Sequence, residues 1–188
     1  KRQASVDEIK RAIEIAEVAP FRYLIQHLGV GGEEFDERKI DAAFTALEEL
    51  SLFARHRGVE ILLENIPNGF SSAERLMWFL ETTHLDLNFC FDVGHAHLGE
   101  GVAKAFDVMR GRIRSTHLHD NDGKQDVHLF PLSGAGGTVD WRETMRLLRQ
   151  GGGNYPLLLE LKECEDFPQP IAAARDIFEK LEALVDEE

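Results

Sequence analysis

The chain has 188 residues, of which 43% are hydrophobic and 29% are charged, and its formal net charge is −13. This composition is typical of a folded globular protein and excludes an intrinsically disordered chain. The negative charge argues against nucleic acid as a partner, because proteins that bind phosphates usually present a basic face.

Secretion and membrane insertion are also disfavoured. The chain contains two cysteines, Cys90 and Cys164, so a disulfide framework is not expected. No apolar run approaches the ~20 residues of a membrane-spanning helix, and the amino-terminal KRQASVDEIK lacks the apolar core of a signal peptide. We therefore expect a cytoplasmic protein with no membrane partner.

Segments with helical and strand-like hydrophobic patterns alternate along the chain. In chain order, we predict a helix at 5–18, a strand at 21–27, a helix at 36–56, a strand at 58–65, a helix from 71, a strand at 85–92, a helix at 101–110, a strand at 111–120, a helix at 140–150, a strand at 154–162 and a helix at 170–185. Ser71 with Glu74, and Asp140 with Glu143, have the spacing of capping boxes. Because no linker divides the pattern, we expect one domain over residues 1–188. The alternation predicts a parallel sheet.

Each predicted strand ends in a residue that can bind a metal ion. These residues are His27, Glu64, Asp92, His117 and Glu160. In a β/α barrel the carboxyl ends of all strands converge at one face, whereas an open doubly wound sheet spreads them along a line. The chain also lacks GxGxxG after its first strand and GxxxxGK[ST] throughout. We therefore predict a barrel and not an open nucleotide-binding sheet.

Imidazole and carboxylate donors in one site predict a divalent cation. Such a mixture suits Mn²⁺, Zn²⁺ or Co²⁺, with Mg²⁺ as the less favoured choice. Among the other histidines, His56 and His84 adjoin helix ends and are expected at the surface. His97 follows His95 by two residues and either supports it or is exposed. His119, Asp120 and Asp122 are explained as turn chemistry, although His119 shares strand parity with His117.

Four stretches, in this order, resemble the xylose isomerase-like TIM-barrel superfamily. They read ILLENIPNG, FCFDVGHAHL, THLHDNDGKQDVHLFPLSGAGGTVDW and LLLELK. This superfamily contains sugar isomerases, ketose 3-epimerases, inosose dehydratases and, as a distant branch, endonuclease IV. The resemblance extends from His27 to Glu160 and implies an α/β fold of the TIM (β/α)8 type.

The number of predicted strands is smaller than this barrel requires. Five strands cannot close an eight-stranded barrel, and the chain opens with Lys1 in a helical pattern. We expect the carboxyl-terminal part of a longer barrel that lacks its first two or three βα units. The strand at 21–27 would then present an open edge, which predicts a homo-oligomer because unpaired edges favour association.

The resemblance also assigns roles to individual residues. The shared metal ligands correspond to Glu64, Asp92, His117 and Glu160. His95 resembles a histidine that contacts substrate in epimerases and binds a second metal in the endonuclease branch. Asp126 and His128 resemble that branch's D-x-H pair for a third zinc, and His27 resembles a further zinc ligand. This chain departs from the pattern after that pair, where it reads SGAGG at 133–137 and related sequences usually read G-E-G.

Three functions are compatible with these residues. In the first, which we favour, a divalent-metal-dependent sugar isomerase or epimerase acts on a ketose or polyol. Glu64 and Glu160 exchange protons through an enediolate, and His95 orients or protonates a substrate oxygen. In the second, an endonuclease IV-like enzyme cleaves abasic DNA with three zinc ions, but its loops lack the basic and aromatic residues expected for DNA. In the third, the protein binds a metal without catalysis. We expect a small sugar-like substrate and no nucleic acid.

Overall fold

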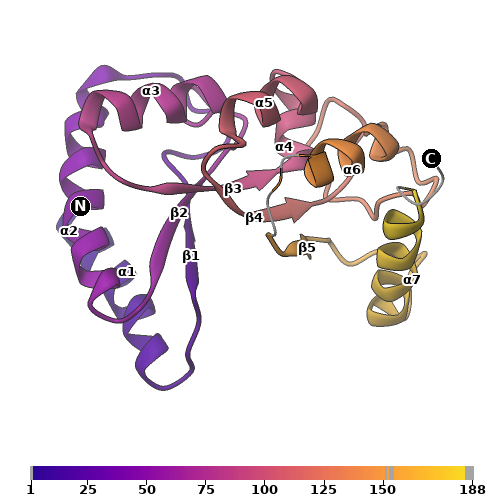
Figure 1. Ribbon diagram of the computed structural model, residues 1–188, viewed down its shortest axis with the longest axis horizontal. Coiled ribbons are helices and arrows are strands. Elements are labelled where there is room, and N and C mark those ends of the chain that lie inside the picture. Colours follow the sequence, from indigo (N-terminus) through magenta and orange to yellow (C-terminus); the bar gives the residue numbers. More distant parts are fainter. Residues whose placement is uncertain (1, 151, 153–154, 185–188) are drawn as a thin grey trace.

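Five parallel strands form the sheet of this protein. The computed structural model describes residues 2–150, 152 and 155–184, and its strands are β1 (Tyr23–Gln26), β2 (Glu60–Glu64), β3 (Asn88–Asp92), β4 (Ile113–Leu118) and β5 (Leu157–Leu159). They pair in the order β1-β2-β3-β4-β5. Because spatial order follows chain order, every crossover advances in one direction, as in a TIM barrel. The predicted fold class is confirmed: the strands form an arc of such a barrel (Figure 1).

Helices connect the strands and cover the outside of the arc (Figure 1). They are α1 (Arg2–Glu14), α2 (Ile40–Arg55), α3 (Ala73–Thr83), α4 (Val93–Leu98), α5 (Val102–Met109), α6 (Trp141–Gln150) and α7 (Pro170–Ala183), with 3₁₀ turns η1 (Ile15–Glu17) and η2 (Glu37–Lys39). Every predicted element is present with shifted ends, although residues 154 and 185, at two predicted ends, lie outside the described residues. In the described part of the chain, no helix combines the length and apolarity needed to cross a bilayer.

Helix α4 was not predicted from the sequence, and the predicted cap of helix α3 is wrong. Six-residue α4 follows β3 directly and is too short for a visible periodicity. Helix α3 is capped by Ser72, whose side chain accepts the Arg75 N–H, and not by Ser71, whose hydroxyl donates to the Leu28 carbonyl at 2.8 Å. The Asp140 cap is confirmed, because its carboxylate accepts the Glu143 N–H at 3.0 Å.

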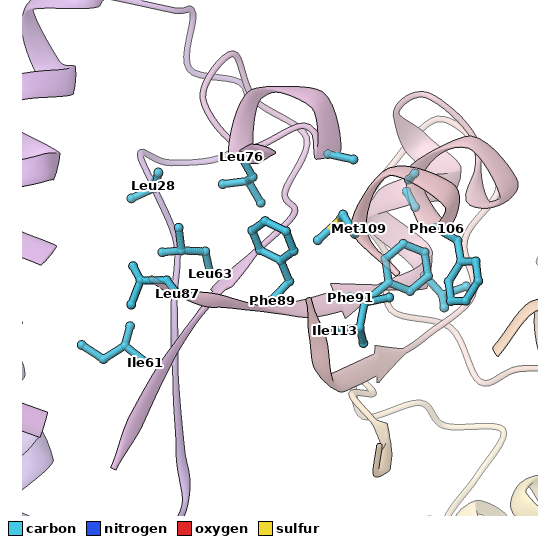
Figure 2. Packing of buried hydrophobic residues seen from close by; sticks show 14 of the residues in the cluster. Leu28, Ile61, Leu63, Leu76, Leu87, Phe89, Phe91, Phe106, Met109 and Ile113 are labelled. Carbon is cyan, nitrogen blue, oxygen red and sulfur yellow. The ribbon is translucent and has the colours of Figure 1, made fainter. Parts of the chain in front are cut away.

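Alternate side chains of the strands serve different faces of the sheet. Figure 2 shows Phe89 and Phe91 of β3 directed toward Leu76, Met109 and Phe106 of the covering helices. Phe91 and Phe106 meet edge to face at 5.7 Å. With a period of two, the intervening positions face the inside of the arc. This alternation places the polar residues at the strand ends on the inner face.

Candidate metal centre

Four predicted ligands meet at the carboxyl ends of β2 to β5. The first cluster consists of Glu64, Asp92, His117 and Glu160, whose potential ligand atoms all lie within 4.8 Å of one another. His117 Nδ1 is at its centre, 3.2 Å from Glu64 Oε1, 2.8 Å from Glu160 Oε2 and 3.9 Å from Asp92 Oδ2. The structure therefore brings together four of the five residues that the strand ends singled out.

Strand pairing and one amide hold this first cluster in place. Asp92 and His117 are register partners in β3 and β4. Asn65, which directly follows Glu64, donates from its amide to the Asp92 carbonyl and accepts the Asp92 N–H, both at 2.8 Å. Sequence reasoning missed Asn65, because an amide adjacent to a charged ligand carries no ligand signal of its own. It fixes the end of β2 against the end of β3.

The donor atoms of the first cluster fit a divalent cation. In the described residues, the buried side-chain polar atoms without a hydrogen-bond partner are Asp92 Oδ2 and His119 Nε2. An unpaired buried carboxylate oxygen is costly. Asp92 is fully buried and Glu64 is 2% exposed, so neither can rely on solvent. A cation among these oxygens would remove that cost, and mixed imidazole and carboxylate donors suit Zn²⁺, Mn²⁺ or Co²⁺.

His27 lies at the margin of the first cluster. Its Nε2 is 3.0 Å from Glu64 Oε2, while its side chain remains 48% exposed. It therefore reaches the opposite carboxylate oxygen from the one that faces His117. This position fits either a further ligand or a partner that holds the Glu64 carboxylate in place.

A second cluster joins α4 to the segment after β4. It consists of His95, His119, Asp126 and His128, with potential ligand atoms within 4.8 Å of one another. His95 Nε2 is 3.2 Å from Asp126 Oδ2, and His128 Nε2 is 3.2 Å from Asp126 Oδ1. The prediction that turn chemistry explains His119 is wrong: its side chain is fully buried, and its ring stacks on that of His128 with centroids 3.9 Å apart. The spacing of two residues between His117 and His119, which places both side chains on the same face of an extended chain, was the signal in the sequence that indicated a buried His119.

Asp120 anchors this segment instead of forming a solvated turn. It is 3% exposed. Its carboxylate accepts the Asn121 N–H at 2.8 Å, the Val139 N–H at 3.0 Å and the Trp141 indole N–H at 2.6 Å. Asp122 behaves as predicted, because its exposed carboxylate accepts the N–H groups of Lys124 and Gln125 in a turn. Asp120 thus ties the loop after β4 to the start of α6.

We expect Asp120→Ala to lower the free energy of unfolding by about 2–4 kcal/mol, since it leaves buried N–H donors of Val139 and Trp141 without an acceptor. Urea unfolding followed by tryptophan fluorescence measures the change. Asp122→Ala is the matched control and should cost less than about 1 kcal/mol, because its turn donors can bond to water. Equal losses in the two variants would contradict the anchoring role.

The remaining histidines lie outside both clusters. His56 and His84 are exposed, as predicted, and His84 ends α3 in a left-handed conformation with φ 55°. His97 Nε2 lies 2.8 Å from the Thr138 hydroxyl, so it contacts the loop before α6 instead of supporting His95.

Burial and charge pairing oppose one another at the two clusters. Burial lowers the pKa of His95, but its contacts with Asp126 and Glu64 outweigh this and raise the pKa to about 10. Burial likewise opposes the charged form of His117, yet contacts with Cys90, Glu160 and Glu64 raise its pKa. Burial favours the neutral form of Glu64, but His117, His27 and His95 hold its pKa below the ordinary value. In the metal-free protein, the positive charges of protonated His95 and His117 therefore offset the negative charges of the neighbouring carboxylates.

Binding of a divalent cation is expected to release protons at pH 7. A metal ligand must offer a lone pair, and the raised pKa of His95 keeps that ring protonated from its ordinary 6.5 up to about 10. The apparent affinity should therefore rise with pH across this range and level off above it. Calorimetric titration of the chelator-treated protein with Zn²⁺, in two buffers of different ionisation enthalpy, counts the protons. A count of zero would contradict the expected exchange.

Comparisons with known proteins agree with the arc of strands. A family model described as "Xylose isomerase-like TIM barrel" matches residues 1–184. A solved D-tagatose 3-epimerase-like protein superimposes with a TM-score of 0.81 and 26% identity, over 99% of this chain and 71% of that one.

Two curated relatives differ in what is known of them. An uncharacterized protein of Methanocaldococcus jannaschii is 27% identical over 176 residues, which cover 88% of this chain and 59% of the relative. A probable endonuclease 4 of Natronomonas pharaonis is 25% identical over 201 residues, which cover 95% of this chain and 70% of the relative. The chain spans between 51% and 59% of the first three curated relatives it matches.

Proposed function

Because this chain belongs to the xylose isomerase-like TIM-barrel family, we propose that it carries the metal site of a sugar isomerase or epimerase that acts on a ketose or polyol. The observation that carries the proposal is the pair of carboxylates that meet at one atom of His117, with Glu64 Oε1 at 3.2 Å and Glu160 Oε2 at 2.8 Å from its Nδ1. The likeness to an epimerase-like structure supports the same reaction class.

The two carboxylates suit opposite steps of a proton transfer. A bound divalent cation would polarise the substrate carbonyl and so acidify the adjacent C–H bond. Glu64, deeply buried and ionised, removes the proton from one face of the substrate carbon to give an enediolate. Glu160, whose side chain is 44% exposed, returns a proton from the other side of the ring of strands. Although burial favours the neutral form of Glu64, contacts with the histidines hold the pKa of both carboxyls low. Glu64 is therefore ready to accept the substrate proton, and Glu160 first takes up from solvent the proton that it returns.

The resemblance implies two places for His95, contact with the substrate or membership of a further metal cluster. Its side chain is 7% exposed, and its Nε2 faces Asp126 of the second cluster. We therefore assign it to holding that cluster, and substrate orientation by His95 stays a prediction.

Solvent-isotope incorporation tests the proposed reaction. We expect the purified, metal-loaded protein to convert at least one ketose of a hexulose and pentulose panel in D₂O, with deuterium at the reacting carbon. Nuclear magnetic resonance of the products detects both conversion and label. Conversion without deuterium would contradict the enediolate, and no conversion of any sugar would count against the isomerase.

The second cluster and the endonuclease relative support one alternative. An abasic-site endonuclease would use the additional ligands to bind further zinc ions. Incubation with a duplex that contains one abasic site decides between the two functions. Cleavage by a protein that leaves every sugar unchanged would favour the endonuclease, whereas an intact duplex with sugar conversion would favour the isomerase.

A further inference from the structure

The two buried side-chain polar atoms that lack a hydrogen-bond partner in the described residues lie on neighbouring side chains. They are Asp92 Oδ2 in the first cluster and His119 Nε2 in the second. Both side chains are fully buried, so neither atom is open to solvent. A buried polar atom in this state costs free energy. An arrangement that gives a partner to both atoms would remove both costs together.

The two side chains meet at the other oxygen of the carboxylate. His119 Nε2 lies 3.1 Å from Asp92 Oδ1, which is close enough for a hydrogen bond but out of line for one. The same oxygen accepts the main-chain N–H of His95 at 2.6 Å. Because each carboxylate oxygen has two lone pairs, Oδ1 can accept a second hydrogen from His119.

The contacts of the His119 ring place the hydrogen of the neutral imidazole on Nε2. A neutral imidazole carries a single N–H. Its Nδ1 lies 3.4 Å from the Asp120 carbonyl, which is long for a hydrogen bond. The Asp92 carboxylate is nearer, and a carboxylate is a stronger acceptor than a main-chain carbonyl. His119 is therefore a donor toward Asp92.

The surrounding chain fixes the His119 ring beside this carboxylate. A Cβ on Gly94 would lie 2.1 Å from ring atom Cε1, so this glycine leaves the space that the ring occupies. The ring of His128 stacks on that of His119 at an interplanar angle of 11°, and the ring of His95 meets it edge to face at 5.2 Å. A donor that is packed in this way keeps its direction, which is what an outer partner of a metal ligand requires.

We propose that His119 is a positioning residue of the first cluster: its Nε2–H holds Asp92 Oδ1 and so directs Asp92 Oδ2 toward the cation. With a cation at Oδ2 and a hydrogen bond at Oδ1, both unpaired atoms have a partner. Asp92 Oδ2 lies on the side of the first cluster, 3.9 Å from His117 Nδ1. Carboxylates that bind metals are commonly held by such outer hydrogen bonds. This inference rests on the metal site of the proposed function and adds to it a residue to which the resemblance assigns no role.

Two substitutions separate a positioning role from simple packing. His119→Leu fills the space with a side chain that cannot donate, and we expect it to weaken the affinity of the first cluster for its ion about 10–100-fold, the usual loss when an outer partner of a metal ligand is removed. His119→Gln keeps an N–H donor in its side-chain amide and should bring the affinity back to within a few-fold of wild type. His97→Leu is the matched control, since His97 bonds to Thr138 outside both clusters.

Titration with Co²⁺, followed by its visible absorption, measures the affinity and the surroundings of the bound ion. All variants carry Asp126→Asn, which removes the carboxylate between His95 and His128, so that the signal reports the first cluster. At saturating Co²⁺ we expect an altered spectrum in His119→Leu and the spectrum of the Asp126→Asn parent in His119→Gln. Loss of stability alone would leave the saturated spectrum unchanged. Parental affinity in His119→Leu, or equal losses in both His119 variants, would overturn the proposal.

A second measurement uses the wild-type protein and so does not depend on how well a variant folds. Imidazole nitrogen resonances of the ¹⁵N-labelled protein loaded with Zn²⁺ should show a hydrogen on His119 Nε2. A His119 Nε2 without a hydrogen would contradict the positioning role. Neither readout depends on turnover, so failure to convert any sugar would remove the proposed reaction and leave this inference standing.

Discussion

Glu64→Gln is expected to reduce kcat/KM for the sugar substrate by about 10³-fold, because general acid–base groups contribute about 10²–10⁴. Glu64 is 2% exposed and its carboxylate contacts His27, His95 and His117. Glutamine keeps the size of the side chain but cannot accept the proton. It also removes a negative ligand, so the affinity for the first ion should fall together with turnover.

Steady-state kinetics at saturating metal, with elemental analysis of each preparation, separates these two effects. Glu60→Gln is the matched control, since Glu60 lies in the same strand at its opposite end and bonds to Asn88. It should leave turnover unchanged. If Glu64→Gln keeps activity within a few-fold of wild type with its metal retained, Glu64 is not the base of the reaction.

Gly94→Ala is expected to displace the buried His119 ring and to disturb both the second cluster and the Asp92 carboxylate beside that ring. Gly94 lies within α4, where alanine is normally favoured by about 1 kcal/mol. At this position, however, the new Cβ would lie between 2.1 and 2.5 Å from three atoms of the buried His119 ring. Overpacking of this kind costs about 1–3 kcal/mol, and the expected net result is a less stable protein with weaker metal binding, because the displaced ring lies 3.1 Å from Asp92 of the first cluster.

Thermal unfolding with and without added Zn²⁺ measures both consequences. Zn²⁺ should stabilise Gly94→Ala less than wild type, because a ligand stabilises only the fold that binds it. Gly111→Ala serves as control, as an added Cβ there meets nothing within 4 Å. Full zinc stabilisation of Gly94→Ala would show that the placement of the His119 ring is not required for metal binding.

The strand ends and their convergence were predictable because a period of two and parallel topology follow from the sequence pattern. Asp92 and His117 share a register position, as the strand ends indicated. Helix α4 was not predictable, because six residues give less than two full turns of periodicity. His119 was misjudged for a physical reason: the sequence does not reveal that the chain stays buried beyond β4, held there by Asp120 and Trp141. The predicted cap at Ser71 was wrong by one residue, because Ser71 and Ser72 are adjacent and either serine can cap a helix that begins here.

The carboxylate of Asp92, a member of the first cluster, also contacts the second. One oxygen accepts the His95 N–H and lies beside His119, whereas the other, without a hydrogen bond, faces His117. A shift of this one side chain therefore changes both sites together. If both clusters bind ions, the two ions are thermodynamically linked: whatever the first does to the affinity of the second, the second does equally to the first. A substitution in the second cluster that moves Asp92 would thus also alter the site where the chemistry is proposed to occur.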